Sequence, residues 1–203
     1  MNECEPIKHE KPIRSYSGEV WKTNRSNKIR LAKDFKNKCA YCDDLDKYSG
    51  GYNSYHVEHF APKEKFKHLE FTYDNLLYSC PYCNISKSNK WVSEDPMVNC
   101  IEDKGFLDPC GDEYYKHLAR DTSGKIVYTS KLGEYIYYEL KLYLRRHEIL
   151  NNLEKIRIKR KELEVKIQEK KEADEDCSKL ELLHYELCST FCRYYDILID
   201  EMD

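Results

Sequence analysis

The chain has little that would take it into or across a membrane. None of its 203 residues falls in an apolar run approaching the roughly 20 that a membrane-spanning helix needs. The first residues, MNECEPIKHEKPIRS, also lack the apolar segment of a secretory signal peptide. We therefore expect a globular, cytoplasmic protein with no membrane partner.

Glycine and proline are absent from the sequence after Gly133. Leucines recur there at helical intervals, which predicts a long helix and then, after EKKEADEDCS, a second one. The two would form a helical hairpin over residues 134–203, which either packs on its own domain or binds a partner. Its apolar positions are Leu140, Leu144, Leu150, Leu153, Ile156, Leu180, Leu183, Leu187, Phe191, Tyr194 and Leu198.

Two further regions precede this hairpin. Residues 1–37 are polar, with an amphipathic helix predicted through EVWKTNRSNKIRLAKDF, whose apolar positions include Val20 and Ile29. Residues 38–133 are rich in cysteine and are broken by SGGYNS, DPC and TSG, which indicates short strands and loops around small helices. The sequence therefore predicts an α+β fold with the core domain at residues 38–133.

Charge is unevenly distributed, although the formal net charge is only −3. Residues 172–203 contain ten acidic residues against Lys179 and Arg193, a net −8, which leaves +5 for residues 1–171. The basic part can still meet phosphates, whereas the acidic tail suits a basic protein surface better than nucleic acid.

Ten cysteines without an export signal indicate reduced thiols. CAYC supplies Cys39 and Cys42, and CPYC supplies Cys80 and Cys83. Two such pairs give the four thiolates that a tetrahedral structural zinc site needs, and they leave no position for a reactive water. Any catalytic metal must therefore bind elsewhere. We expect the other six to be free thiols: Cys4, Cys100, Cys110, Cys177, Cys188 and Cys192.

Between the two cysteine pairs, YHVEHFAPKEKF places Glu58 next to His59. Zinc would fasten this strand to the segment after the second pair, and so bring Glu58 and His59 near Asn75 and Asn84. Oxygen ligands suit magnesium or manganese, and a neutral imidazole can take a proton from water. These residue types together predict a metal-dependent hydrolytic site.

The segment after CPYC is predicted to be a short helix that Pro81 opens. Asn84, Lys87 and Ser88 then share one helix face. We expect Lys87 to contact a phosphate, while Lys63, Lys65 and Lys67 belong to a solvated loop. Strand alternation places His56 on the same face as Glu58, which makes it an additional candidate ligand.

These motifs resemble the HNH endonuclease family in VEHFAP, DNLL and CNISK. The resemblance implies a ββα-metal core in which His59 is the general base and Glu58 and Asn84 hold the catalytic metal. It also implies that Asn75 holds the hairpin loop and orients His59. Glutamate replaces the more usual aspartate, and asparagine replaces histidine at the third position.

A longer series of motifs looks like the HNH subunits of Septu-type and retron-associated anti-phage systems, the PtuB family. The series is KCAYC, VEHFAPK, DNLLYSCPYCNISKSNK, FLDPC and LKLYLRRHEILNNLEKIRIKR, over about residues 28–160. This resemblance implies a PtuA-like ATPase partner and a DNA or RNA substrate.

Each site residue also has a structural interpretation. His59 could end a strand, Asn75 could close a turn and Asn84 could cap a helix. The corresponding alternative function is a zinc-binding nucleic-acid or protein adaptor without catalysis, for which His59 is not needed.

Overall fold

The structure, a computed structural model, describes residues 4–8 and 10–200. Residues 1–3 and 9 of the predicted N-terminal segment, and residues 201–203 of the acidic tail, lie outside the described residues. The fold is α+β, as predicted, and the chain divides into two compact units within residues 1–147 and 148–203. The boundaries predicted at residues 37/38 and 133/134 stay predictions.

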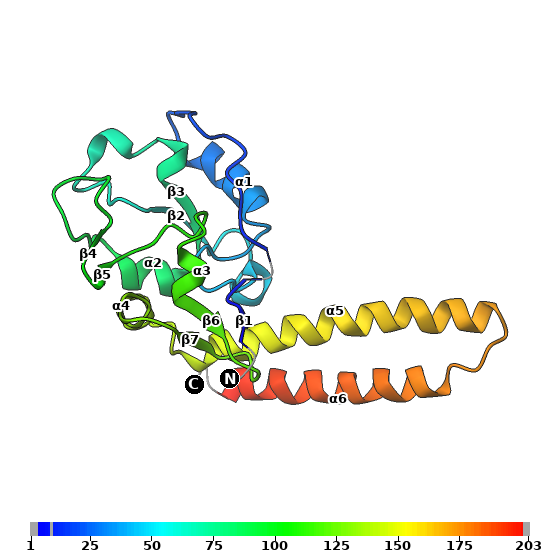
Figure 1. Cartoon of the computed structure of the whole chain (residues 1–203). Helices are drawn as coiled ribbons and strands as arrows, with labels where there is room; N and C mark the ends of the chain where they lie inside the picture. Colours follow the sequence, from blue (N-terminus) through cyan, green and yellow to red (C-terminus); the bar gives the residue numbers. More distant parts are fainter. Residues whose placement is uncertain (1–3, 9, 201–203) are drawn as a thin grey trace. The chain divides into compact units, whose positions relative to one another are not determined.

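Short strands and helices alternate along the first unit, and two long helices follow (Figure 1). The strands are β1 (Glu5–Pro6), β2 (His56–His59), β3 (Leu76–Ser79), β4 (Cys100–Ile101), β5 (Lys104–Gly105), β6 (Leu118–Arg120) and β7 (Ile126–Tyr128). The helices are α1 (Asn24–Asp34), α2 (Pro81–Lys87), α3 (Tyr114–His117), α4 (Lys131–Glu139), α5 (Arg145–Glu172) and α6 (Ser178–Asp200). In the described ranges, no helix has the length and apolar content to span a membrane.

A β-hairpin followed by a short helix forms the centre of the first unit. Strands β2 and β3 pair antiparallel, with His56 opposite Ser79 and His59 opposite Leu76. Helix α2 starts directly after β3 because Cys80 caps it: its Sγ accepts a hydrogen bond from the Cys83 N–H at 3.4 Å. Pro81 occupies the first helical turn, where its missing N–H costs nothing.

Helix α1 packs against this hairpin through Leu31 and Phe35, which are both buried. It begins at Asn24, later than predicted, and two of its expected apolar positions are exposed: Val20 and Ile29. Val20 lies before the helix and forms an isolated bridge with Thr72, so it extends the hairpin region instead of the helix.

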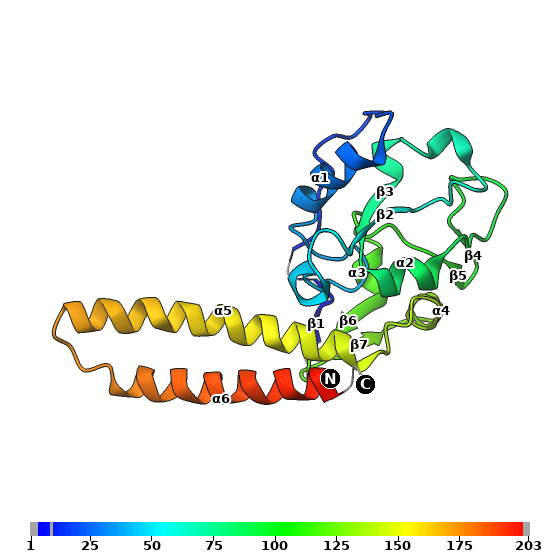
Figure 2. The same cartoon turned by 180° about the vertical axis from the view of Figure 1, so that it is seen from behind.

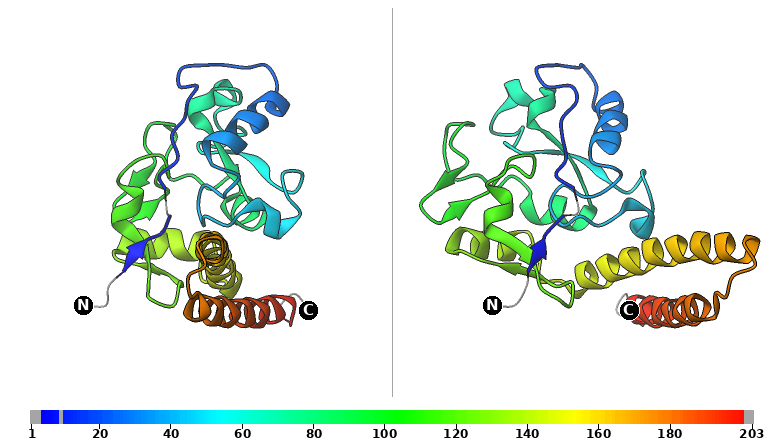
Figure 3. Two further views of the ribbon diagram at one scale, coloured as in Figure 1. Left: turned by 90° about the vertical axis from the view of Figure 1, so that its right-hand side faces the viewer. Right: turned by 45° about the vertical axis from the view of Figure 1, so that its right-hand side comes forward.

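A separate three-stranded sheet has the order β1-β6-β7, which brings the N-terminal strand against the middle of the chain (Figure 3). Arg120 of β6 is fully buried behind it and donates hydrogen bonds to the carbonyls of Ile7, Gly124 and Cys42. Its guanidinium therefore links the sheet to the first cysteine pair.

The predicted long helix after Gly133 is interrupted. Helix α4 ends at Glu139, and Lys141 has a φ of 54°, a left-handed conformation that ends a helix even without glycine. The Leu142 N–H bonds back to the Tyr137 carbonyl, which closes the turn before α5 begins. Helical periodicity continues through this break, so the sequence pattern alone does not show it.

In the second unit, α5 and α6 lie side by side and antiparallel (Figures 1 and 2). Glu164 on α5 contacts His184 on α6, and Lys171 pairs with Glu181 near the connecting loop. The apolar side chains along α6 are half-buried or exposed, except for Leu198, which is buried.

Candidate active site and four-cysteine metal centre

The four paired cysteines converge, as their spacing predicts. Cys39, Cys42, Cys80 and Cys83 are completely buried, and their sulfur atoms lie within 4.8 Å of one another. The Sγ atoms of Cys42 and Cys80 are 3.8 Å apart. Sulfurs about 2.3 Å from a tetrahedral zinc would lie about 3.8 Å apart, so the Cys42–Cys80 separation matches a zinc site.

The thiols already interact strongly with one another. Burial raises the pKa of every thiol in the group, but hydrogen bonds from the other three lower the pKa of Cys39 well below its ordinary value. Burial and the hydrogen bonds with Cys39 and Cys80 raise the pKa of Cys42 well above its ordinary value. The cluster thus favours one thiolate, and a bound cation would be needed to ionise all four.

Asp44 and His147 hold the first cysteine pair from outside. The His147 Nδ1–H donates to Asp44 Oδ2 at 2.8 Å, and Arg146 donates to the same oxygen at 2.7 Å. Burial alone would lower the pKa of His147, but the neighbouring Asp44 carboxylate raises it to about 10. Ligating atoms of Cys42, Asp44 and His147 also lie within 4.8 Å of one another.

No ligand spacing in the sequence marks His147, so no role was predicted for it. Its partner Asp44 is 103 residues away in the sequence, so only the fold brings the two together. Lys8 was missed for the same reason: its ammonium donates to the Cys39 carbonyl at 2.7 Å.

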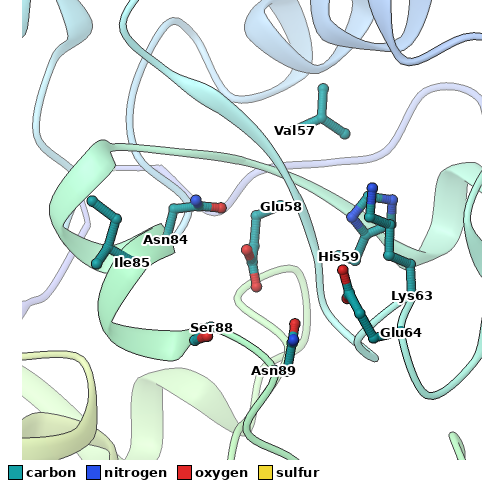
Figure 4. A pocket seen from close by; sticks show the side chains of 9 residues that line it. All are labelled: Val57, Glu58, His59, Lys63, Glu64, Asn84, Ile85, Ser88 and Asn89. Carbon is teal, nitrogen blue, oxygen red and sulfur yellow. The ribbon is translucent and has the colours of Figure 1, made fainter.

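A cavity of about 420 Å³ lies between β2, the loop after it and α2. It collects three of the predicted site residues, Glu58, His59 and Asn84, together with Ser88 of the predicted helix face. Figure 4 shows the Glu58 carboxyl group between Asn84 on one side and His59 and Glu64 on the other. The lining also includes Val57, Lys63, Glu64, Ile85 and Asn89.

His59 is held in one ring orientation. Its Nε2 lies 3.0 Å from the Glu70 carbonyl oxygen. A carbonyl can only accept, so Nε2 carries the proton and Nδ1 keeps its lone pair. Burial lowers the pKa of His59, and the hydrogen bond to Glu70 opposes this only in part. The ring is therefore neutral near pH 7 and can accept a proton at Nδ1.

Asn75 fastens the loop that follows His59. Its Oδ1 accepts from the Ala61 N–H at 2.8 Å and its Nδ2 donates to the Ala61 carbonyl at 2.9 Å. The backbone continues the clamp, since the Phe60 N–H donates to the Asn75 carbonyl. Asn75 does not line the cavity, and the role that the family resemblance implies for it, holding the hairpin loop, agrees with these contacts.

Glu58 and Lys87 form a buried ion pair, with Lys87 Nζ 2.9 Å from Glu58 Oε1. Burial raises the pKa of Glu58 to about 7, and the Lys87 ammonium offsets only part of this effect. Lys87 also donates to the His59 carbonyl at 3.1 Å. Its side chain is 0% exposed. The structure thus places Lys87 under the cavity instead of at its surface, where a phosphate contact was predicted.

The remaining predicted positions fall outside this group. His56 is exposed at the start of β2 and does not line the cavity. Asn84 does not cap α2, because Cys80 does. Glu64, which no sequence motif marks, adds a second carboxylate to the cavity lining. Glu64 lies in a lysine-rich segment that does not indicate a site residue, whereas the adjacent His59 made Glu58 recognisable as one.

Strand β2 and helix α2 both line this cavity, and α2 also carries Cys83 of the four-cysteine cluster. A family model described as HNH endonuclease matches residues 39–90, the stretch from the first cysteine to just after α2. Residues 39–90 therefore form an HNH endonuclease domain.

Two curated relatives narrow the comparison. The chain is 36% identical over 76 residues to the Septu protein PtuB of Bacillus thuringiensis, which covers 36% of this chain and 27% of that protein. It is 30% identical over 123 residues to the Septu protein PtuA of Bacillus mycoides (strain KBAB4), covering 51% of this chain and 17% of that protein. The chain thus spans about a quarter or less of the length of either relative.

Proposed function

We propose that this protein is a metal-dependent endonuclease that hydrolyses phosphodiester bonds of DNA or RNA. The observation that carries the proposal is the cavity that Glu58, His59 and Asn84 line together. A carboxylate, an amide oxygen and a neutral imidazole at one surface are the groups that metal-assisted hydrolysis requires.

The residues divide the work according to their chemistry. The Nδ1 atom of His59 accepts the proton of the attacking water, because Nε2 is engaged with Glu70. Glu58 and Asn84 offer oxygen atoms that fit magnesium or manganese. When bound, such an ion stabilises the negative charge that develops on the phosphate and the leaving oxygen. Asn75 keeps the backbone beyond His59 in place.

Lys87 acts from beneath the site. Its ammonium compensates the charge of a buried carboxylate that would otherwise be costly to ionise. We propose that it keeps Glu58 anionic and correctly placed, instead of contacting the substrate itself.

The four-cysteine centre has a separate role. Its sulfurs are completely buried, and all four tetrahedral positions would be filled by protein. We propose that it holds a structural zinc ion, which fastens the first cysteine pair to the start of α2. None of the ten cysteines, all of which lie in the described ranges, forms a disulfide, which is compatible with the reducing cytoplasm, where we place the protein.

The relatives support a place in anti-phage defence. Both carry Septu names, and one of them, PtuA, contains a segment similar to this chain within a much longer protein. We propose that this chain works with a PtuA-like ATPase partner, which restrains or directs the nuclease.

A cleavage assay tests the proposal. The purified chain, alone and with a PtuA-like ATPase, is incubated with DNA duplex, single-stranded DNA and RNA in magnesium or manganese. Cleavage should require the divalent ion and should disappear in His59→Ala but not in His68→Ala, an exposed histidine outside the cavity. Binding without cleavage under every condition would instead support the adaptor function.

A further inference from the structure

The lysines around the cavity are almost all neutralised by neighbouring carboxylates. Lys87 is paired with Glu58, as described above, and the others follow the same pattern. The pairs are Lys63 with Glu70, Lys65 with Glu94, Lys67 with Glu70, and Lys90 with Glu139, at N···O distances of 3.7, 2.6, 2.6 and 2.6 Å. A cation beside its own carboxylate adds little attraction for a phosphate. The backbone of a bound nucleic acid therefore needs other cations.

Helix α1 supplies such cations. Within residues 4–8 and 10–200, no ion pair is formed by Lys22, Arg25, Lys28 or Lys33. Arg25 and Lys28 are three residues apart, so their side chains are neighbours on the helix surface. The nearest acidic residue of the helix, Asp34, is engaged by the Tyr73 hydroxyl and the Ser15 N–H.

Lys28 also contacts the segment that leads into β2, the strand that carries Glu58 and His59. Its ammonium lies 4.5 Å from the centre of the Tyr52 ring and 3.4 Å from the Asn53 carbonyl oxygen. His56, the exposed first residue of β2, follows Asn53 by only three positions in the chain. The start of β2 thus presents a cation, an aromatic ring and an imidazole together.

The spacing of this group from His59 suits a nucleic-acid backbone. His56 and His59 are three residues apart on β2, which is about 10 Å at roughly 3.3 Å per residue. This length is about three nucleotides along one strand of a duplex, at about 3.4 Å each. Strand alternation also places His56 on the same side of β2 as Glu58, which lines the cavity.

We propose that Arg25 and Lys28 of α1, with Tyr52 and His56 at the start of β2, form the surface that binds the phosphate backbone of the nucleic acid cleaved in the cavity. The inference rests on the proposed endonuclease function. The two cations bind phosphates on the strand beside the scissile bond, and Tyr52 holds Lys28 in place through its ring. Contacts of this kind position the substrate without reading its sequence.

Charge reversal tests this surface. In a His59→Ala background, Arg25→Glu with Lys28→Glu is compared with Lys104→Glu plus Lys125→Glu, two exposed lysines on β5 and the β6–β7 turn. Both double variants change the net charge equally. Binding to short labelled DNA duplex, single-stranded DNA and RNA is measured by anisotropy over a range of salt concentrations, with the ATPase partner present and absent.

The α1 variant should bind at least tenfold more weakly than the control. Its plot of log affinity against log salt should lose about two phosphate contacts, or roughly 1.4 to 1.8 in slope. Zinc content and thermal unfolding should match those of the control. Equal affinity and equal salt dependence in the two variants would overturn the inference. It would also be overturned if the α1 variant lost binding to the ATPase but kept its affinity for nucleic acid, or if the parent chain bound no nucleic acid.

The outcome is separable from that of the proposed function. The same substitutions in the chain with His59 intact report on cleavage. If the chain cleaves and the α1 variant cleaves and binds like the control, the endonuclease stands and this surface does not. If no version cleaves but the α1 variant still loses binding, the surface stands and the adaptor function gains support.

Discussion

The four-cysteine centre and the cavity beside β2 and α2 differ in burial and in the residue types that form them. The four-cysteine centre is completely buried and is made of one residue type. The cavity lined by Glu58, His59 and Asn84 combines different residue types and offers room for a substrate. A closed centre stabilises the fold, whereas an accessible one can exchange water and substrate. The comparison predicts that damage to the first removes the domain and damage to the second removes only its chemistry.

Metal removal should have the largest effect. A strong zinc chelator should unfold the first unit, because a structural zinc site contributes on the order of 10 kcal/mol to folding. Far-ultraviolet circular dichroism and elemental analysis would follow the loss, and added zinc should restore both. A folded, well-behaved preparation with no zinc would contradict the structural role of the cluster.

His59→Ala should leave the fold and the zinc content unchanged while abolishing cleavage. Loss of a general base lowers the rate by roughly 10²–10⁴-fold. Single-turnover cleavage by the variant is compared with that by His68→Ala, which keeps the imidazole of the cavity. Near parental rates in a clean His59→Ala preparation would place the base on another residue.

Asp44→Asn should destabilise the first unit without removing any sulfur ligand. The carboxylate accepts from His147 and Arg146, and breaking a buried ion pair on one side costs about 3–5 kcal/mol. Urea unfolding of the zinc-loaded protein measures the change. Asp112→Asn is the control, since Asp112 pairs with Lys11 at the surface. Equal midpoints for the two variants would show that Asp44 does not anchor the cysteine pair.

What the sequence could and could not predict follows from the same contrast. Cys39, Cys42, Cys80 and Cys83 were predictable because metal ligands come in short, fixed spacings. The neighbouring Glu58 and His59 were recognisable as a motif. In contrast, helical periodicity put Lys87 on the face of Asn84 but carried no information about depth, and only tertiary packing buries Lys87 against Glu58.

Long-range pairs and backbone turns were also beyond the sequence. Asp44 and His147 meet only because the start of α5 packs beside the first cysteine pair. The break at Lys141 involves neither glycine nor proline, so its left-handed conformation leaves no compositional mark. The first feature depends on residues far apart in the sequence and the second on backbone conformation, and local residue patterns predict neither.

Asn75→Ala should have a smaller effect, and it should lower both the stability of the first unit and the rate of cleavage. It removes side-chain hydrogen bonds to Ala61 and so costs about 1–3 kcal/mol of stability. Since the loop after His59 loses its clamp, cleavage should slow more than substrate binding weakens. Asn75→Asp keeps the acceptor to the Ala61 N–H and should recover part of the loss. Unchanged cleavage in Asn75→Ala would limit this residue to closing the turn.

The smallest effect on the nuclease core is expected from the C-terminal hairpin. Truncation after about residue 171 removes α6 and should leave zinc binding and the cavity of the first unit intact. Association with the proposed PtuA-like ATPase should weaken, because α6 carries acidic residues and exposed apolar side chains that suit a basic protein surface. Truncation also uncovers α5, so Glu186→Lys with Asp196→Lys provides a variant that keeps both helices. Co-purification with the ATPase compares the three chains. Equal retention of all three would show that the hairpin only completes the fold, and that the partner docks on the first unit.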